Sequence, residues 1–100
     1  YDVFGDGSVI VMSTPGHTPG HQVVAVELGN AGWIVLGGDL YHYPEEIETD
    51  RVPTFEFDAE LSRASRAKVL RFIEANDATL WIEHDIPTHA ALPRSPEYVD

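Results

Sequence analysis

Short apolar runs separated by turn residues occupy the N-terminal part of the chain. Turns are indicated at Gly5-Asp6-Gly7 and at Gly29-Asn30-Ala31-Gly32, because glycine and asparagine accept the backbone angles of tight hairpins. The apolar alternation around these turns predicts a β-meander with its loops at one end. Its strands are expected over residues 2–4, 8–13, 22–28 and 33–37.

The pattern changes in the second half of the chain. Periodicity is lost over residues 40–57, where we expect a lid or a substrate wall, since so long a loop is uncommon unless it is functional or disordered. Asp58 is a good N-cap for a helix over residues 59–75, whose apolar residues share one side. A buried strand is expected over residues 78–83. The proline-rich residues 87–100 are expected to run irregularly along the surface.

This order of elements indicates an α/β fold with mostly antiparallel strands and one long helix. A single helix covers only one face of such a sheet. Because both faces of a sheet must bury against another layer, the pattern predicts a partner that covers the second face.

Charge and composition exclude several classes of partner. The chain has 100 residues and a formal net charge of -11, which argues against nucleic acid and anionic membranes. No apolar run approaches the roughly 20 residues of a membrane span, and no secretory signal is visible, so we expect a cytoplasmic location. Most of the basic residues fall in the expected helix, on a side that we expect to be solvated: Arg63, Arg66, Lys68 and Arg71.

Candidate metal ligands stand at the ends of apolar runs. The chain has no cysteine, so any metal ion must be held by nitrogen and oxygen. His17 lies in a proline- and glycine-rich loop after the second strand, and Asp39 and His84 each follow a later strand. Side chains at the ends of successive strands can converge on one rim of the sheet, and imidazole with carboxylate suits zinc and similar ions. The simpler alternatives are an exposed turn histidine for His17 and local caps for Asp39 and His84.

Five segments fit one known pattern in combination. They are Thr14-Pro15-Gly16-His17-Thr18-Pro19-Gly20-His21, Gly38-Asp39-Leu40-Tyr41-His42, Pro53-Thr54-Phe55-Glu56-Phe57-Asp58, Glu83-His84-Asp85 and Pro96-Glu97-Tyr98. Together they resemble the C-terminal half of a metallo-β-lactamase-fold hydrolase, most like the N-acyl-homoserine lactonase branch, over nearly the whole chain. The resemblance implies an αββα architecture, with residues 1–100 as its C-terminal half and the N-terminal half absent.

The resemblance also implies two divalent metal ions, with zinc expected and iron, manganese or cobalt compatible with the same donors. His17 would complete the site of the first ion, Asp39 would bridge both ions, and His84 would bind the second. A hydroxide bridging the ions would attack the lactone carbonyl, which makes Asp39 part of the catalytic centre. The family's H-x-H-x-D-H motif occurs nowhere in the chain. The remaining ligands would come from a missing N-terminal half or from a second chain, as in a homo-oligomer.

Neighbours of the expected ligands are predicted to support them. In the corresponding motif of the family, the second histidine, here His21, follows the metal ligand and supports the loop that carries it. Metal-binding histidines usually donate their other ring N–H to an acceptor, so the flanking Asp85 and Glu83 are expected to orient the His84 ring, with a backbone carbonyl as the alternative.

A third position concerns the substrate. Many lactonases of the branch carry a tyrosine three residues beyond the bridging aspartate, and here that position is His42, between Tyr41 and Tyr43. One of the three is expected to face the substrate, with Tyr41 and His42 as the catalytic candidates. The alternative is that both tyrosines are ordinary packing aromatics.

Three functions therefore compete. The first is a metal-dependent hydrolase that opens the lactone ring of N-acyl-homoserine lactones, as in quorum quenching, with this chain supplying half of the site. The second is another hydrolase of the superfamily acting on a small ester, such as a thioesterase, a β-lactamase or an organophosphate hydrolase. The third is a non-catalytic fragment that folds by self-association.

Overall fold

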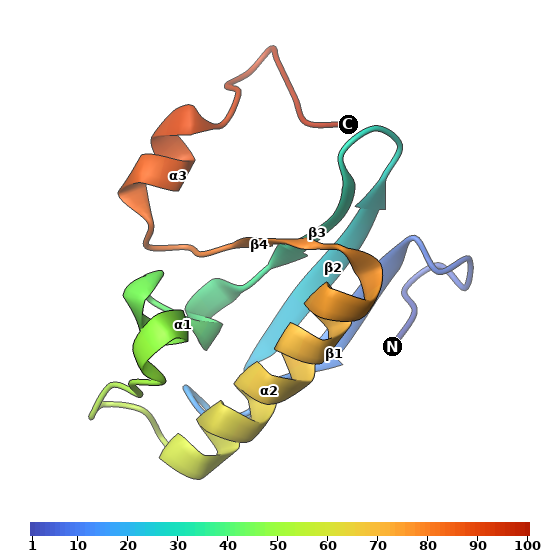
Figure 1. Cartoon of the computed structure of the whole chain (residues 1–100). Helices are drawn as coiled ribbons and strands as arrows, with labels where there is room; N and C mark the ends of the chain where they lie inside the picture. The colour runs from blue at the N-terminus through green and yellow to red at the C-terminus, as the bar shows by residue number, and fades with distance from the viewer.

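A computed structural model, which describes residues 1–100, contains one four-stranded sheet with the strands in chain order. The strands are β1 (Val9–Ser13), β2 (Gln22–Leu28), β3 (Gly32–Leu36) and β4 (Thr79–Trp81). The first three form the expected antiparallel meander, and β4 pairs with β3 in parallel. The C-terminal ends of β1, β3 and β4 therefore lie at the same edge of the sheet (Figure 1).

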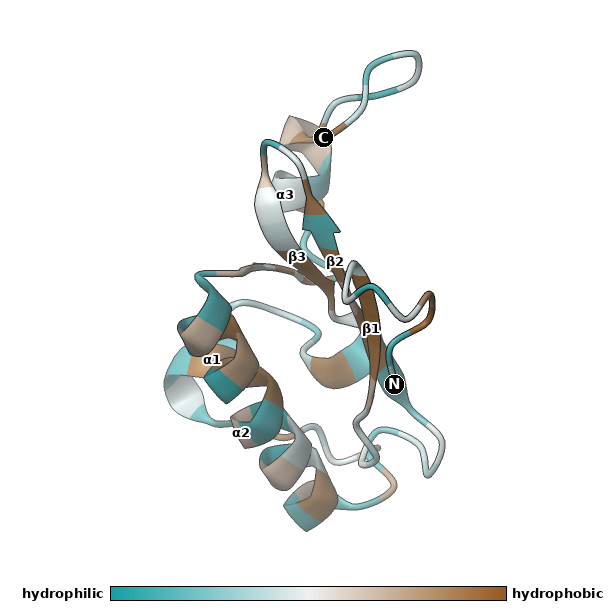
Figure 2. Ribbon diagram, turned by 90° about the vertical axis from the view of Figure 1, so that its right-hand side faces the viewer, coloured by the Kyte–Doolittle hydropathy of each residue, from teal (hydrophilic) through white to brown (hydrophobic).

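The helical elements are η1 (Gly38–Leu40), α1 (Glu45–Thr49), α2 (Ala59–Asn76) and α3 (Ile86–Ala91). The long helix α2 begins where the sequence predicts, because the Asp58 side chain accepts hydrogen bonds from the backbone N–H groups of Glu60 and Leu61, both at 2.9 Å. Seen from the side in Figure 2, α1 and α2 lie on the same side of the sheet. None of the helices combines the length and the apolar character that a membrane crossing requires.

The core lies between α2 and one face of the sheet. Ala25 and Val35 are paired neighbours on β2 and β3, and both are completely buried there together with Val69 of α2. At the edge of this core the Trp33 and Phe72 rings meet edge to face, with their centroids 5.3 Å apart. The alternation of apolar residues along β2 and β3 thus supplies the face that α2 covers.

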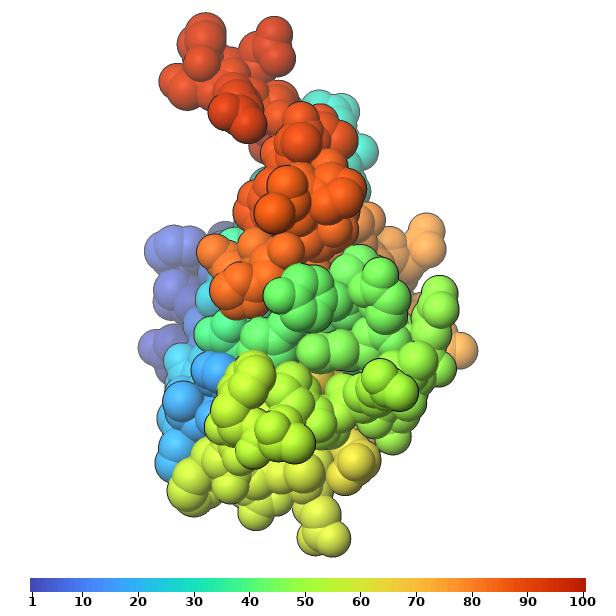
Figure 3. All heavy atoms as spheres, turned by 90° about the vertical axis from the view of Figure 1, so that its left-hand side faces the viewer, coloured from blue at the N-terminus to red at the C-terminus, as the bar shows by residue number.

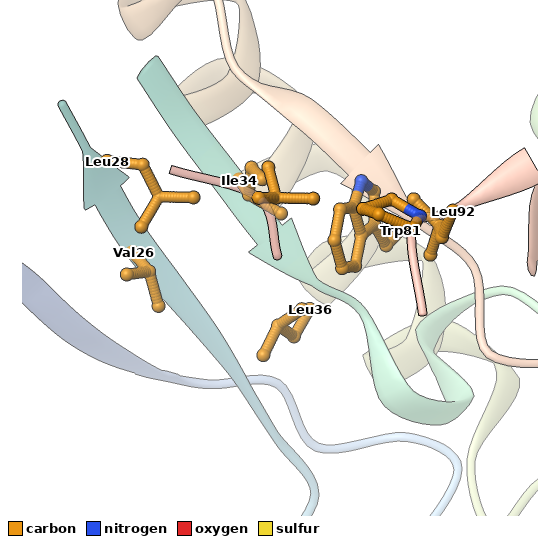
Figure 4. Close-up of a pocket in the computed structure, with 8 residues that line it drawn as sticks. Val26, Leu28, Ile34, Leu36, Trp81 and Leu92 are labelled. Atoms are coloured by element: carbon orange, nitrogen blue, oxygen red, sulfur yellow. The ribbon is translucent and has the colours of Figure 1, made fainter. Parts of the chain in front are cut away.

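The opposite face of the sheet, called the outer face below, is also apolar and is not covered by a helix. The register places seven aliphatic residues on it: Val9, Val11, Val24, Val26, Leu28, Ile34 and Leu36. Part of it forms an open depression of about 330 Å³, whose far wall is built by Leu92, Pro93 and Val99 of the C-terminal segment (Figure 4). This open face is the uncovered second face that the pattern of elements predicts.

The structure corrects several local expectations. Residues 2–4 form no strand but only a bridge between Asp2 and Ile10, because the Asp2 carboxylate accepts hydrogen bonds from Gly5 and Gly7 and turns the chain back. The loop expected over 40–57 contains the short helix α1, and the expected strand over 78–83 is reduced to β4.

The C-terminal segment is also more regular than expected. It contains α3, where Pro87 occupies the first turn, a position at which proline is tolerated. Beyond α3 the chain loops away from the body of the molecule (Figure 3) and returns at Asp100, whose carbonyl accepts hydrogen bonds from the N–H groups of Asn30 and Ala31.

Candidate metal centre

His17, Asp39 and His84 meet at the sheet edge where β1, β3 and β4 end. His84 Nε2 lies 2.9 Å from Asp39 Oδ1, and His17 Nε2 lies 3.6 Å from Asp39 Oδ2. The carboxylate therefore has one oxygen directed toward each imidazole. That is the arrangement in which a carboxylate can bridge two cations, each of which also has a histidine ligand.

The loop that carries His17 is docked against the start of α2. Gly16 has a φ of +148°, and a Cβ there would lie 2.5 Å from the Ser62 Cα. The Asp58 N–H donates to the Gly16 carbonyl at 3.0 Å, and the Ser65 hydroxyl donates to the Pro15 carbonyl at 2.7 Å. Only glycine permits this close approach, which fixes the loop beside the helix and aims His17 at Asp39.

His21 joins the same loop to the backbone of Asp39. Its Nε2 accepts a hydrogen bond from the Asp39 N–H at 3.1 Å, so the ring proton sits on Nδ1. Nδ1 lies 2.8 Å from the Thr14 hydroxyl and 3.1 Å from the Thr14 carbonyl. Both ring nitrogens are thus engaged, and in this arrangement His21 offers none to a metal ion.

Glu56 is a member of the site that the sequence did not reveal. Its side chain is only 2 % exposed, and its Oε1 lies 3.3 Å from His17 Nδ1. The other oxygen accepts a hydrogen bond from the Ser62 hydroxyl at 2.6 Å. Glu56 stands between two phenylalanines in a stretch without periodicity, and only folding brings that stretch against His17.

The structure separates the three adjacent side chains that were candidates for facing the substrate. His42 lies at the site, with its Nε2 3.9 Å from Asp39 Oδ1 and its ring stacked on that of His84, with centroids 5.6 Å apart. Tyr41 is 3 % exposed and belongs to the core, where burial raises the pKa of its hydroxyl. Tyr43 is 58 % exposed. The expectation that Tyr41 acts in the site is not met by this geometry.

Behind His42 lies a buried ion pair. Arg66 Nη2 is 2.7 Å from Glu46 Oε2, and the same oxygen accepts a hydrogen bond from the His42 N–H at 3.2 Å. The Arg66 guanidinium also donates to the carbonyls of Leu40 and Arg51, at 2.9 and 2.6 Å. Arg66 is 2 % exposed. The expectation that all four basic residues of α2 are solvated is therefore wrong for Arg66, because three acceptors from residues 40–51 surround its guanidinium.

The Asp39 carboxylate lies at the centre of the site. The hydrogen bond from His84 lowers the pKa of its carboxyl, and the nearby imidazoles of His17 and His42 act in the same direction. Asp85 does not reach the His84 ring as expected: its carboxylate accepts a hydrogen bond from the Thr88 hydroxyl instead. His89 is exposed on α3.

The donors gathered here fit a divalent metal ion. Ligand atoms of His17, His42 and Glu56 all lie within 4.8 Å of one another, and Asp39 and His84 adjoin them. Imidazole nitrogen and carboxylate oxygen are the donors that zinc and other first-row ions take when no thiolate is present.

Comparison with known proteins gives a consistent result. No family model matches the chain. Over 98 residues it is 34% identical to the N-acyl homoserine lactonase AttM of Rhizobium radiobacter, which corresponds to 98% of this chain and 37% of that protein. It is 31% identical to the N-acyl homoserine lactonase AiiA of Bacillus thuringiensis subsp. kurstaki, over 95% of this chain and 39% of that protein. The chain thus spans less than two fifths of these relatives.

Solved structures agree with the sequence comparison. An N-acyl homoserine lactone hydrolase with the product N-hexanoyl-L-homoserine at its catalytic metal centre matches 99% of this chain with 38% of its own, with a TM-score of 0.86 and 30% identity. AidC, a dizinc quorum-quenching lactonase, matches 81% of this chain with 29% of its own, with a TM-score of 0.61 and 26% identity. In sequence and in fold, the chain is therefore a relative of the N-acyl homoserine lactonases of the metallo-β-lactamase fold.

Proposed function

We propose that this chain is part of a metal-dependent hydrolase that opens the lactone ring of N-acyl homoserine lactones, and that His17, Asp39 and His84 are its metal ligands. The observation that carries the proposal is the Asp39 carboxylate, which lies between two imidazoles at 2.9 and 3.6 Å. The identity to lactonases over nearly the whole chain supports the same reaction.

Two divalent ions suit this arrangement, and the dizinc centre of AidC makes zinc the first choice. Such ions supply Lewis-acid polarisation of an ester carbonyl and acidify a water molecule so that it attacks at neutral pH. The residues of this chain do the remaining work. Asp39, His17 and His84 would bind the ions. Glu56 holds the His17 ring, and His21 fixes the backbone of Asp39.

A hollow beside these ligands is the proposed substrate site. It has a volume of about 370 Å³ and lies between the loop after η1 and the end of β4, with His42, Tyr43, Pro53, Phe55 and His84 among its walls. The Phe55 ring is 67 % exposed and stands 5.2 Å from the His42 ring, centroid to centroid. We propose that the lactone lies at the histidines and that the acyl chain runs along Phe55.

The remaining metal ligands are proposed to come from polypeptide that packs on the outer face. The chain contains no H-x-H-x-D-H motif and corresponds to 38% of the solved lactonase. Its outer face is apolar, and Leu36 there is 43 % exposed. A further segment of the same protein, or a second chain, would bury that face and complete the site.

A chimera tests the proposal directly. The matched 98 residues of AttM are replaced by this chain, and the conversion of N-hexanoyl-homoserine lactone to N-hexanoyl-homoserine is followed by mass spectrometry. We expect turnover that a chelator abolishes and zinc restores. Asp39→Asn should lower it by more than about 100-fold, beyond the usual range for residues that only support a ligand. Asp77→Asn, at the C-terminal end of α2, is the matched control and should leave turnover unchanged.

The 100-residue chain by itself is the second arm, and it should open the lactone no faster than buffer. Metal-dependent turnover by the chain alone would contradict the proposal that other polypeptide completes the site. A folded, metal-loaded chimera that leaves the lactone intact would refute the proposed reaction.

A further inference from the structure

His42 has the same surroundings as His17, although the proposed function gives it no metal. Each ring directs its Nε2 toward Asp39, at 3.6 Å for His17 and 3.9 Å for His42. Each ring also has its Nδ1 beside a carboxylate, Glu56 at 3.3 Å and Glu46 at 3.5 Å. An imidazole with a carboxylate behind one nitrogen is the usual setting of a metal-bound histidine.

The carboxylate behind His42 is held firmly. Glu46 accepts hydrogen bonds from the Arg66 guanidinium and from the His42 backbone N–H. The side chains of Glu46 and Arg66 are almost fully buried. His42 Nδ1 is buried as well and has no partner that meets hydrogen-bond geometry. Its position beside a carboxylate nevertheless favours the ring proton on Nδ1. That tautomer leaves the Nε2 lone pair facing Asp39.

Two imidazole lone pairs and a carboxylate repel one another unless a cation lies between them. The separations of 3.6 and 3.9 Å exceed hydrogen-bond length but remain within ligand spacing. Two atoms bound to one zinc ion, each at about 2.0–2.2 Å, can be no more than about 4.4 Å apart. The ring of His42 also lies 5.4 Å from that of His17 and 5.6 Å from that of His84, so all three imidazoles surround the Asp39 carboxylate.

We infer that His42 is a further metal ligand, so that this chain alone can hold one divalent ion with His17, Asp39 and His42. Two imidazole nitrogens and one carboxylate oxygen supply three of the four positions that zinc prefers and leave the fourth open. The inference rests on the proposed metal centre and deepens it. The chain would bind a single ion before any other polypeptide completes the site.

Cobalt(II) is a suitable probe, because its visible absorption reports coordination number and donors without any assay of activity. We expect the 100-residue chain to bind one cobalt ion with a four-coordinate spectrum. His42→Tyr should weaken cobalt affinity by more than about tenfold and alter the spectrum. Glu46→Gln should weaken it less, since the ring remains. His89→Tyr is the matched control, because His89 is exposed on α3, and it should change neither quantity.

The same variants in the AttM chimera keep the test decisive if the short chain folds poorly. Circular dichroism establishes folding there, and cobalt affinity is again measured. Equal affinity and spectra for the parent and His42→Tyr would overturn the inference, even if lactone hydrolysis changed, because His42 would then act on substrate. Cobalt binding that depends on His42 in a chimera without lactonase activity would instead refute the proposed function and leave the ligand role intact.

Discussion

Arg66 Nη2 lies 2.7 Å from Glu46 Oε2, and the two side chains are 2 % and 11 % exposed, so this ion pair joins the middle of α2 to α1 in the interior of the molecule. The guanidinium also covers the Tyr41 ring, with its central carbon 4.4 Å from the ring centroid. These contacts of Arg66 therefore attach the segment that carries His42 to α2.

Breaking this pair should be costly. Arg66→Met leaves a buried, unpaired carboxylate, and we expect a loss of about 3–5 kcal/mol in the free energy of unfolding, measured by urea denaturation. The double variant with Glu46→Leu should recover most of that loss. The control is Arg63→Met, whose partner Asp50 lies 3.6 Å away and is largely exposed; its effect should stay below about 1 kcal/mol. Equal losses for the two arginine variants would contradict a structural role for the buried pair.

Glu56 should tune the metal site through His17. Glu56→Gln keeps the size of the side chain but removes the charge beside His17 Nδ1, and we expect zinc affinity to fall about 10- to 100-fold. Competition with a chromophoric chelator measures the change. Glu60→Gln, in the exposed first turn of α2, provides the comparison and should bind zinc as the parent does. Unchanged affinity in Glu56→Gln would remove Glu56 from the site.

Gly16 and Gly20 lie in the same loop but should respond differently to alanine. At Gly16 the added Cβ meets the backbone of Ser62 and the φ of +148° is unfavourable, whereas at Gly20 nothing lies within 4 Å. We expect Gly16→Ala to cost at least about 1–3 kcal/mol of stability and to weaken zinc binding. Gly20→Ala should do neither. Thermal unfolding measures the change in stability of the two variants, and competition with a chelator measures the change in zinc affinity. Equal results for the two variants would contradict the prediction.

Asp39 should make the metal-free chain sensitive to acid. Its pKa is lowered in the folded state, mainly by the hydrogen bond from His84 and then by the charges of His17 and His42. The stabilisation is therefore complete above the unfolded pKa of about 3.9 and is lost as pH falls through the lower folded value. Urea denaturation at about pH 5 and about pH 3 should show a smaller loss for Asp39→Asn than for the parent chain. Equal losses would mean that the carboxylate gains nothing from its neighbours.

Local sequence signals determined the regular elements and the ligand types. Alternating apolar residues fixed β2 and β3, the Asp58 cap fixed the start of α2, and the lack of cysteine restricted any metal to nitrogen and oxygen. The convergence of His17, Asp39 and His84 also followed from the sequence, because each stands just beyond a strand, and those three strand ends lie at one edge of the sheet.

Only the tertiary structure decided which of the remaining polar residues belong to the site. Glu46, Glu56 and Arg66 are ordinary charged residues in the sequence: the first two lie in a stretch without periodicity, and Arg66 is expected on the solvated side of the helix. They are buried because residues 40–57 fold back over the N-terminal half of α2, a contact that depends on hydrogen bonds between distant segments. The same folding turned Tyr41 into the core and His42 toward Asp39, since adjacent side chains on one segment leave it in different directions.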